Sequence, residues 1–181
     1  ALGIKEPVRW VEPNVLQRGQ VEIRKGDVIA NLPYADNCTL WFDHHHTNQI
    51  DFPFNGVFKI APSAAGIIFE HYRDRFKRDY SELVTATDKI DSADLSLDEV
   101  LRPEDNPYIL ISMTVNGQDP DGPDYWNALV ALFHKGSLQK ALAHPMVQER
   151  CRLAIEQNRL FRDILLSHTT IRGQVAVTDL R

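Results

Sequence analysis

The stretch that decides the fold is TLWFDHHH, which occupies residues 39–46. Its first half is apolar on consecutive positions, a pattern typical of a strand in a parallel sheet that is covered on both faces. Its second half is a carboxylate followed by three imidazoles. Polar side chains at the end of a buried strand lie where open α/β sheets place their functional sites. We therefore expect a parallel sheet with a site at the end of this strand.

Similar patterns flank this stretch on both sides. Residues 27–32 read DVIANL and end at a proline, and residues 56–60 read GVFKI, so both segments are predicted strands. Apolar residues then recur at helical spacing, which predicts helices over residues 63–76, 81–90, 106–115, 124–133 and 145–167. The sequence thus predicts an α/β fold: a Rossmann-like parallel sheet wrapped by helices, with a helical second half.

The domain division is predicted from the end of the long helical pattern. Residues 1–167 are expected to form one domain, and residues 168–181, which alternate like a strand, are expected to begin a second, C-terminal one. Residues 1–4 read like a helix end closed by glycine, and the chain stops in a strand-like segment. We therefore expect the sequence to be truncated at both ends.

Bulk composition narrows the class of protein. The 181 residues are 43% hydrophobic with a net charge of −5, which does not favour nucleic-acid binding through bulk charge. Cys38 and Cys151 are far apart and form no CxxC motif, so a reducing cytoplasm is the expected location. No apolar run reaches the roughly 18 residues of a membrane span, and no membrane partner is expected.

The histidines after Phe42 are candidate metal ligands. Neutral imidazoles and carboxylates suit Mn²⁺, Fe²⁺ or Zn²⁺, and a carboxylate beside a metal-bound histidine can orient its ring. The alternative is a histidine-rich surface turn. A second acidic motif, TDKIDSAD at residues 87–94, offers further ligands or is a solvated helix end. Residues 62–66, PSAAG, open a helix whose free N–H groups could hold a phosphate; close helix–sheet packing is the alternative.

These motifs carry a resemblance to a known family. Asp43, His44 and His45 after an apolar strand, the phrase NLPY at residues 31–34 and the acidic motif downstream resemble the DHH phosphoesterases, in particular an exopolyphosphatase-related branch. The resemblance implies a hydrolase that cleaves phosphodiester or phosphoanhydride bonds by metal-activated water. The implied substrates are polyphosphate, short oligonucleotides, cyclic dinucleotides or another phosphorylated small molecule.

The resemblance also implies a metal centre with two ions, Mn²⁺ in the first place and Mg²⁺, Co²⁺ or Zn²⁺ as alternatives. His44 would bind one ion, and Asp88 would bridge both. Lys89 follows Asp88 where the family has threonine. Asn31 stands where the family's second motif has an aspartate, and as a neutral ligand it would bridge two cations poorly.

The remaining site residues are assigned to catalysis and substrate binding. By the same resemblance His45 would face the substrate phosphate, and Asp43 would orient a histidine. His46 and Asp91 are expected on the substrate side, with Asp91 also able to serve as a ligand or as a partner for a cation. Asp91 lies three residues after Asp88, on the same face if the segment is helical.

The family's first motif, Asp-x-Asp near the N-terminus, has no counterpart here. The one match, residues 119–121, lies in a proline- and glycine-rich turn late in the chain. We expect the motif before Ala1, and the chain as given is expected to be inactive. A degenerate, non-catalytic module that binds nucleotide or phosphate is the alternative function, favoured by Asn31; a structural metal site is a third. Monomer and homodimer are both left open.

Overall fold

The computed structural model describes residues 6–119 and 121–179, and the chain divides into two compact units. The first unit ends at Ser96 and the second begins at Leu97. Residues 1–4, the predicted helix end, lie outside the described residues, as do the last two residues of the chain. The predicted boundary after residue 167 falls inside the second unit, where a long helix gives way to a hairpin, and it stays a prediction.

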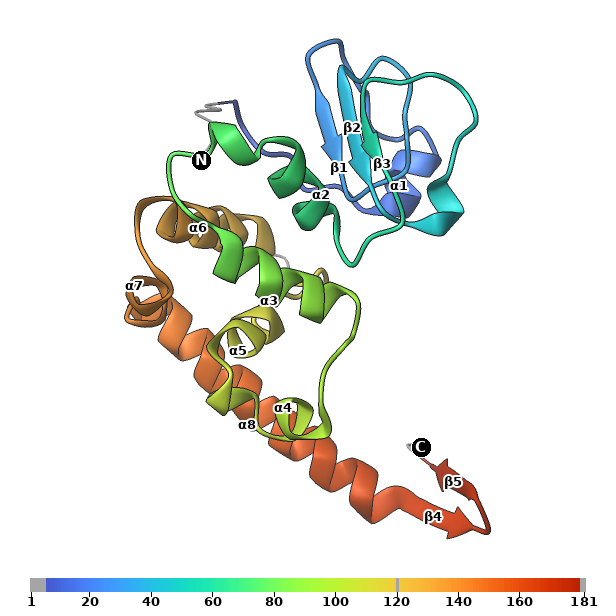
Figure 1. The fold of residues 1–181 in the computed structure, drawn as a ribbon. Helices are drawn as coiled ribbons and strands as arrows, with labels where there is room; N and C mark the ends of the chain where they lie inside the picture. Colours follow the sequence, from blue (N-terminus) through green and yellow to red (C-terminus); the bar gives the residue numbers. More distant parts are fainter. Residues whose placement is uncertain (1–5, 120, 180–181) are drawn as a thin grey trace. The chain divides into compact units, whose positions relative to one another are not determined.

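A parallel sheet in the first unit positions the site (Figure 1). Its described strands are β1 (Val28–Ala30), β2 (Leu40–Asp43) and β3 (Gly56–Phe58), with β2 in the middle. Ala30 pairs with Phe42, and Phe42 pairs with Val57, in parallel register. The carboxyl ends of the strands therefore lie at one edge of the sheet. The predicted α/β fold with a parallel sheet is confirmed.

The consecutive apolar residues of β2 are explained by cover on both faces. Trp41 and Phe42 are 0% and 1% exposed, and they point to opposite faces because side chains alternate along a strand. The Trp41 ring lies 4.9 Å from Phe54 and stacks at 5.4 Å on Phe58, whereas the Phe42 ring lies 5.8 Å from Tyr72, which follows a helix. This double burial anchors the strand end that carries the acidic and imidazole side chains.

Helices complete the first unit, and its described helical segments are α1 (Pro13–Gln17), η1 (His46–Asn48), α2 (Ala64–His71), η2 (Arg73–Arg75) and α3 (Ser81–Asp91). Helix α2 contacts β2 and β3, and α3 packs beside α2. The helix predicted to reach residue 76 ends at His71, and η2 follows it. Phe76 instead packs its ring on Phe69 and Tyr80, at 5.4 and 5.7 Å.

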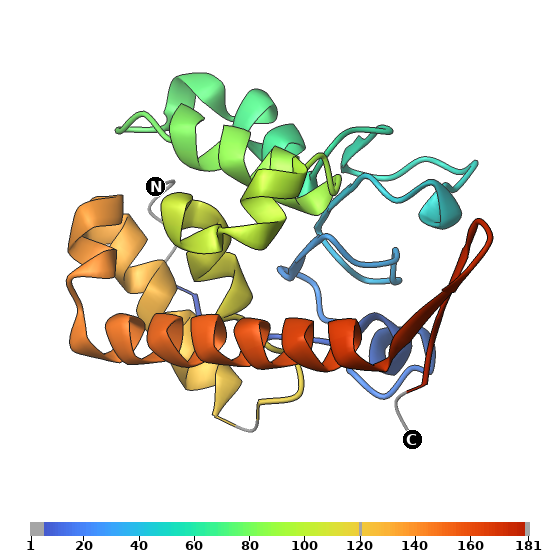
Figure 2. The same cartoon turned by 90° about the horizontal axis from the view of Figure 1, so that it is seen from below.

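The second unit is helical up to its terminal hairpin (Figure 2). Its described elements are α4 (Leu97–Leu101), η3 (Pro103–Asp105), α5 (Pro107–Met113), α6 (Gly122–Lys135), α7 (Leu138–Leu142), α8 (Pro145–His168), β4 (Thr169–Arg172) and β5 (Val175–Thr178). The hairpin strands are antiparallel and continue directly from α8. The predicted helical second half is confirmed, and α6 begins two residues earlier than predicted.

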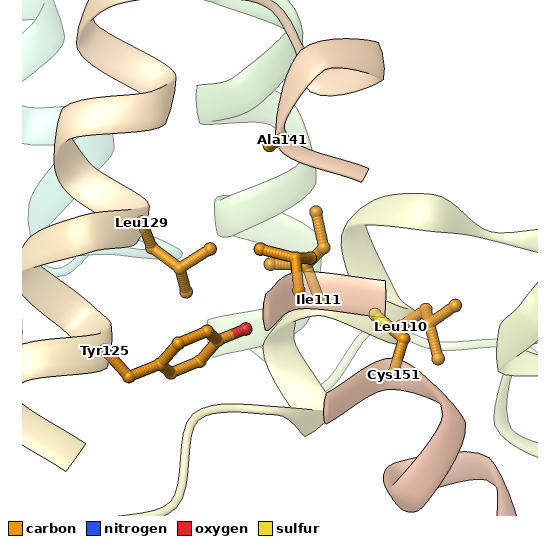
Figure 3. Packing of buried hydrophobic residues seen from close by; sticks show 7 residues of the cluster. Leu110, Ile111, Tyr125, Leu129, Ala141 and Cys151 are labelled. Atoms are coloured by element: carbon orange, nitrogen blue, oxygen red, sulfur yellow. The ribbon is translucent and has the colours of Figure 1, made fainter. Parts of the chain in front are cut away.

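A separate apolar core holds the second unit together (Figure 3). Tyr125 and Leu129 of α6 face Leu110 and Ile111 of α5, with Cys151 of α8 beside them. Burial raises the pKa of the Cys151 thiol, so this residue stays protonated and serves packing, not nucleophilic chemistry. Among the described residues, no helix is both long enough and apolar enough to cross a bilayer.

Candidate metal centre

The predicted site residues of the DHH motif lie at the carboxyl edge of the sheet. Asp43 is the last residue of β2, and His44 and His45 follow it. Among the described residues, the acidic and imidazole groups of these three offer ligand atoms that all lie within 4.8 Å of one another. The carboxyl edge of a parallel sheet is where α/β proteins place their sites, so the location fits the predicted function.

Asp43 is a fully buried carboxylate, with 0% exposure. Both of its oxygens accept hydrogen bonds: Oδ1 lies 2.8 Å from His45 Nδ1, and Oδ2 lies 2.7 Å from Asn48 Nδ2. A buried charge needs such partners because burial removes its hydration. These contacts are those of a carboxylate that orients a histidine ring and fixes the turn η1. The orienting role of Asp43 stays a prediction.

The two ring nitrogens of His44 differ in their hydrogen bonds. Its Nδ1 lies 2.8 Å from the carbonyl oxygen of Ala61, and because a carbonyl can only accept, Nδ1 carries the hydrogen in this contact. In the neutral ring Nε2 then holds a lone pair. This Nε2 atom is buried and has no hydrogen-bond partner among the described residues. Its acidic neighbour is Asp91, whose Oδ2 atom lies 3.3 Å away. Burying a polar atom without a hydrogen bond is unfavourable, so the orphaned Nε2 fits a metal ligand.

His45 and His46 are exposed, in contrast to Asp43. The His45 side chain is 45% exposed, and its ring lies 4.2 Å from the ring of His44. If its Nδ1 donates to Asp43, its Nε2 is left for a metal or a substrate. His46 begins η1. The predicted substrate contacts of both residues stay predictions.

The two acidic side chains of α3 have different partners. Asp88 Oδ1 accepts a hydrogen bond of 2.5 Å from the Ser63 hydroxyl, and Asp91 Oδ2 lies 3.3 Å from His44 Nε2. Asp91 is the last residue of α3, one turn beyond Asp88. The structure therefore brings Asp91 to His44 and attaches Asp88 to the start of α2.

The small residues at 62–66 make room for Asp88. Ser63 is 1% exposed, and its hydroxyl also accepts a hydrogen bond of 2.9 Å from the Gly66 N–H as the N-cap of α2. A Cβ at Gly66 would lie 2.7 Å from Asp88 Oδ1, closer than real contacts allow. Sequence reasoning noticed this segment but did not connect it to Asp88. Glycine one turn into a helix was the available signal.

Replacing Ser63 with alanine is expected to lower the free energy of unfolding by about 1–3 kcal/mol, because the N-cap bond and the bond to a carboxylate are lost together. Ser137→Ala is the matched control: Ser137 is also an N-cap, exposed, with only a cap contact of 3.5 Å to the Lys140 N–H. Urea unfolding measures both. Equal losses in the two variants would show that the Ser63–Asp88 bond adds nothing.

Asn31 follows β1 at the same edge and has a left-handed backbone, with φ of 60°. Asparagine tolerates this conformation better than most residues. Its backbone N–H donates to the Phe42 carbonyl at 2.9 Å, and the residue is exposed. The contact fixes the path of the chain after β1. The predicted role of the Asn31 amide as a metal ligand stays a prediction.

Comparisons with known proteins support the α/β fold and indicate which class of enzyme the chain is similar to. No protein-family model matches the chain, and no curated protein matches it. Among solved structures, the chain is similar to a phosphodiesterase. That protein is the pGpG-specific phosphodiesterase PggH from Vibrio cholerae, with 30% sequence identity, a TM-score of 0.81 and cover of 97% of this chain. The chain spans 60% of the length of that protein.

Proposed function

We propose that this protein is a metal-dependent phosphodiesterase that hydrolyses short oligonucleotides. The observation that carries the proposal is the orphaned, buried Nε2 of His44 at the carboxyl edge of the sheet. Its support is the similarity of nearly the whole chain to a phosphodiesterase specific for pGpG. Of the substrate classes that the sequence left open, this similarity favours a linear dinucleotide over polyphosphate and over cyclic dinucleotides.

The residues present fit divalent cations. His44 Nε2 and the carboxylate of Asp88 would hold them, with the Asn31 amide as a weaker oxygen ligand, and Mn²⁺ is the cation that such mixed nitrogen and oxygen ligands suit. When bound, two such ions supply positive charge for the phosphate and lower the pKa of a water. The fit rests on the donor types and on the orphaned nitrogen.

The other residues of the chain would orient and contact the substrate. Asp43 holds the His45 ring through Nδ1, which leaves the exposed edge of that ring free to face a phosphate oxygen of the substrate. In that position, the His45 ring would help to stabilise the charge that builds up on the phosphoryl oxygens. His46, exposed on η1, would lie on the substrate side.

The direct test is hydrolysis by the full-length protein. With Mn²⁺ and pGpG, we expect one water to add across the phosphodiester bond and release two molecules of GMP, detected by ion-exchange chromatography. Removing the metal with EDTA should abolish turnover, and added Mn²⁺ should restore it. If the metal-loaded protein leaves pGpG, longer oligonucleotides, cyclic dinucleotides and polyphosphate uncut, the proposal fails.

A non-catalytic binding module is the second candidate, because Asn31 stands where the family resemblance implies an aspartate that binds metal. The same assay separates the two. Tight binding of pGpG without turnover, unchanged by Asn31→Asp, would favour the binding module. Turnover by the natural protein would exclude it.

A further inference from the structure

We infer that Ser63 and Gly66 act together as positioning residues for the Asp88 carboxylate, and thereby set the affinity of the protein for its divalent cation. The inference rests on the proposed function, because it requires that Asp88 binds a metal. Neither Ser63 nor Gly66 would touch the cation or the substrate. Both lie at the start of α2 and would act through a carboxylate of α3, the helix that packs beside α2.

The Ser63 hydroxyl makes hydrogen bonds to two different helices. It accepts from the Gly66 N–H at 2.9 Å, as the N-cap of α2, and it donates to Asp88 Oδ1 of α3 at 2.5 Å. A hydroxyl has one hydrogen to donate, so the bond to Asp88 uses the hydrogen while the cap uses a lone pair. Ser63 is 1% exposed, which excludes water from this hydroxyl. The Asp88 oxygen therefore has a fixed partner.

Helix capping alone does not explain this arrangement. An N-cap serine is favoured because it satisfies a free N–H group of its own helix, and this accounts for the contact with Gly66. Ser137, the N-cap of α7, shows the ordinary case: it is exposed, and among the described residues its hydroxyl contacts only the Lys140 N–H, at 3.5 Å. The buried bond from Ser63 to a carboxylate of another helix points to a further role.

Gly66 supplies the space in which the Asp88 carboxylate lies. A Cβ added at Gly66 would lie 2.7 Å from Oδ1, 3.3 Å from Oδ2 and 3.4 Å from Cγ of Asp88. Gly66 is the third residue of α2, where the conformational freedom of glycine is not needed and alanine would form the helix better. The close approach of the carboxyl group is therefore a physical reason for glycine at this position.

One short segment thus orients candidate ligands from two elements. The Ala61 carbonyl fixes the His44 ring, and two residues further on the Ser63 hydroxyl fixes the Asp88 carboxylate. A ligand that is already held in place loses less conformational freedom when it binds. Groups that hydrogen-bond to a metal-binding carboxylate therefore contribute to the affinity for the metal.

The experiment measures Mn²⁺ affinity of the full-length protein without substrate, from the electron paramagnetic resonance signal of free Mn²⁺. Ser63→Gly removes the hydroxyl, yet glycine is close to serine as an N-cap. Gly66→Ala introduces a methyl group that the Asp88 side chain can avoid only by moving its carboxylate. We expect each variant to weaken Mn²⁺ binding by about 10-fold or more, the range found for groups that support metal ligands.

Two comparisons separate positioning of the carboxylate from loss of helix stability. Ser63→Ala removes the same hydroxyl but leaves a poorer N-cap, so it should melt at a lower temperature than Ser63→Gly and yet lose the same Mn²⁺ affinity. Ser137→Ala, a cap variant in the second unit, should stay within about 2-fold of the natural affinity, because distant sites act independently. An affinity that follows the melting temperature across the Ser63 variants, or natural affinity in Gly66→Ala, would overturn the inference.

The outcomes distinguish this inference from the function on which it rests. If the natural protein binds Mn²⁺ and cleaves pGpG while Ser63→Gly and Gly66→Ala do both equally well, the positioning role is refuted and the proposed function stands. If the natural protein binds no Mn²⁺ at all, both fail together.

Discussion

Replacing His44 with alanine is expected to lower kcat/KM of the full-length protein for pGpG by about 100-fold or more, and to weaken Mn²⁺ binding in parallel. Residues that only support a metal ligand already cost 10- to 100-fold when removed, and His44 offers its ring nitrogen directly. The Nε2 atom is buried and orphaned, and the ring is fixed by the Ala61 carbonyl. Single-turnover hydrolysis and Mn²⁺ titration would measure the two effects.

Two further variants test whether a cavity, or the loss of any histidine, could explain the same result. His44→Gln keeps much of the side-chain volume, so a loss shared by alanine and glutamine variants reflects the missing imidazole and not a cavity. His168→Ala removes an exposed histidine at the end of α8, in the other unit, and should leave turnover unchanged. A His44→Ala protein that binds Mn²⁺ normally and still cleaves pGpG would refute His44 as a ligand.

The sheet could be predicted from the sequence because burial on both faces leaves a local trace. Trp41 and Phe42 pack against different partners on opposite faces of β2, and this requires apolar side chains at consecutive positions. The extent of α2 could not be predicted in the same way. Phe76 continued the apolar spacing, yet it packs on Phe69 from beyond the helix end. The spacing of apolar residues indicates which side chains are buried. It does not distinguish a longer helix from a turn after the helix that packs an apolar side chain back onto it.

The candidate site was predictable in its residue types but not in its contacts. The motif Asp43–His45 could be recognised in the sequence because it follows an apolar strand. The bond from Ser63 to Asp88 joins residues 25 positions apart in the chain, and it depends on how α3 docks on α2. The partner of His44 Nδ1 is a backbone carbonyl, at Ala61, and every residue has one. Neither contact leaves a pattern in the sequence. The proximity of Asp91 to His44 also depends on how α3 packs, so it could be found only in the structure.

Replacing Gly56 with alanine is expected to lower the free energy of unfolding by about 3 kcal/mol or more. Gly56 begins β3 and pairs with Trp41, with φ of 124°, a backbone conformation that other residues rarely adopt. A Cβ there would lie 1.9 Å from the Trp41 carbonyl oxygen and 2.7 Å from its nitrogen. Backbone atoms of a central strand cannot rotate away as a side chain can, so β3 must separate from β2.

Gly26→Ala is the matched control, because Gly26 has a similar backbone, with φ of 108°, but no atom within 4 Å of an added Cβ. It should cost only the strain of the backbone, about 1–2 kcal/mol. The excess for Gly56→Ala then measures the clash with Trp41. The distortion caused by the clash should extend to the candidate metal centre, because Trp41 lies two residues before Asp43 on the strand that carries the DHH motif. Mn²⁺ affinity should therefore fall in Gly56→Ala and stay unchanged in Gly26→Ala. Equal unfolding free energies for the two variants would mean that the β2–β3 pairing contributes little to the stability of this unit.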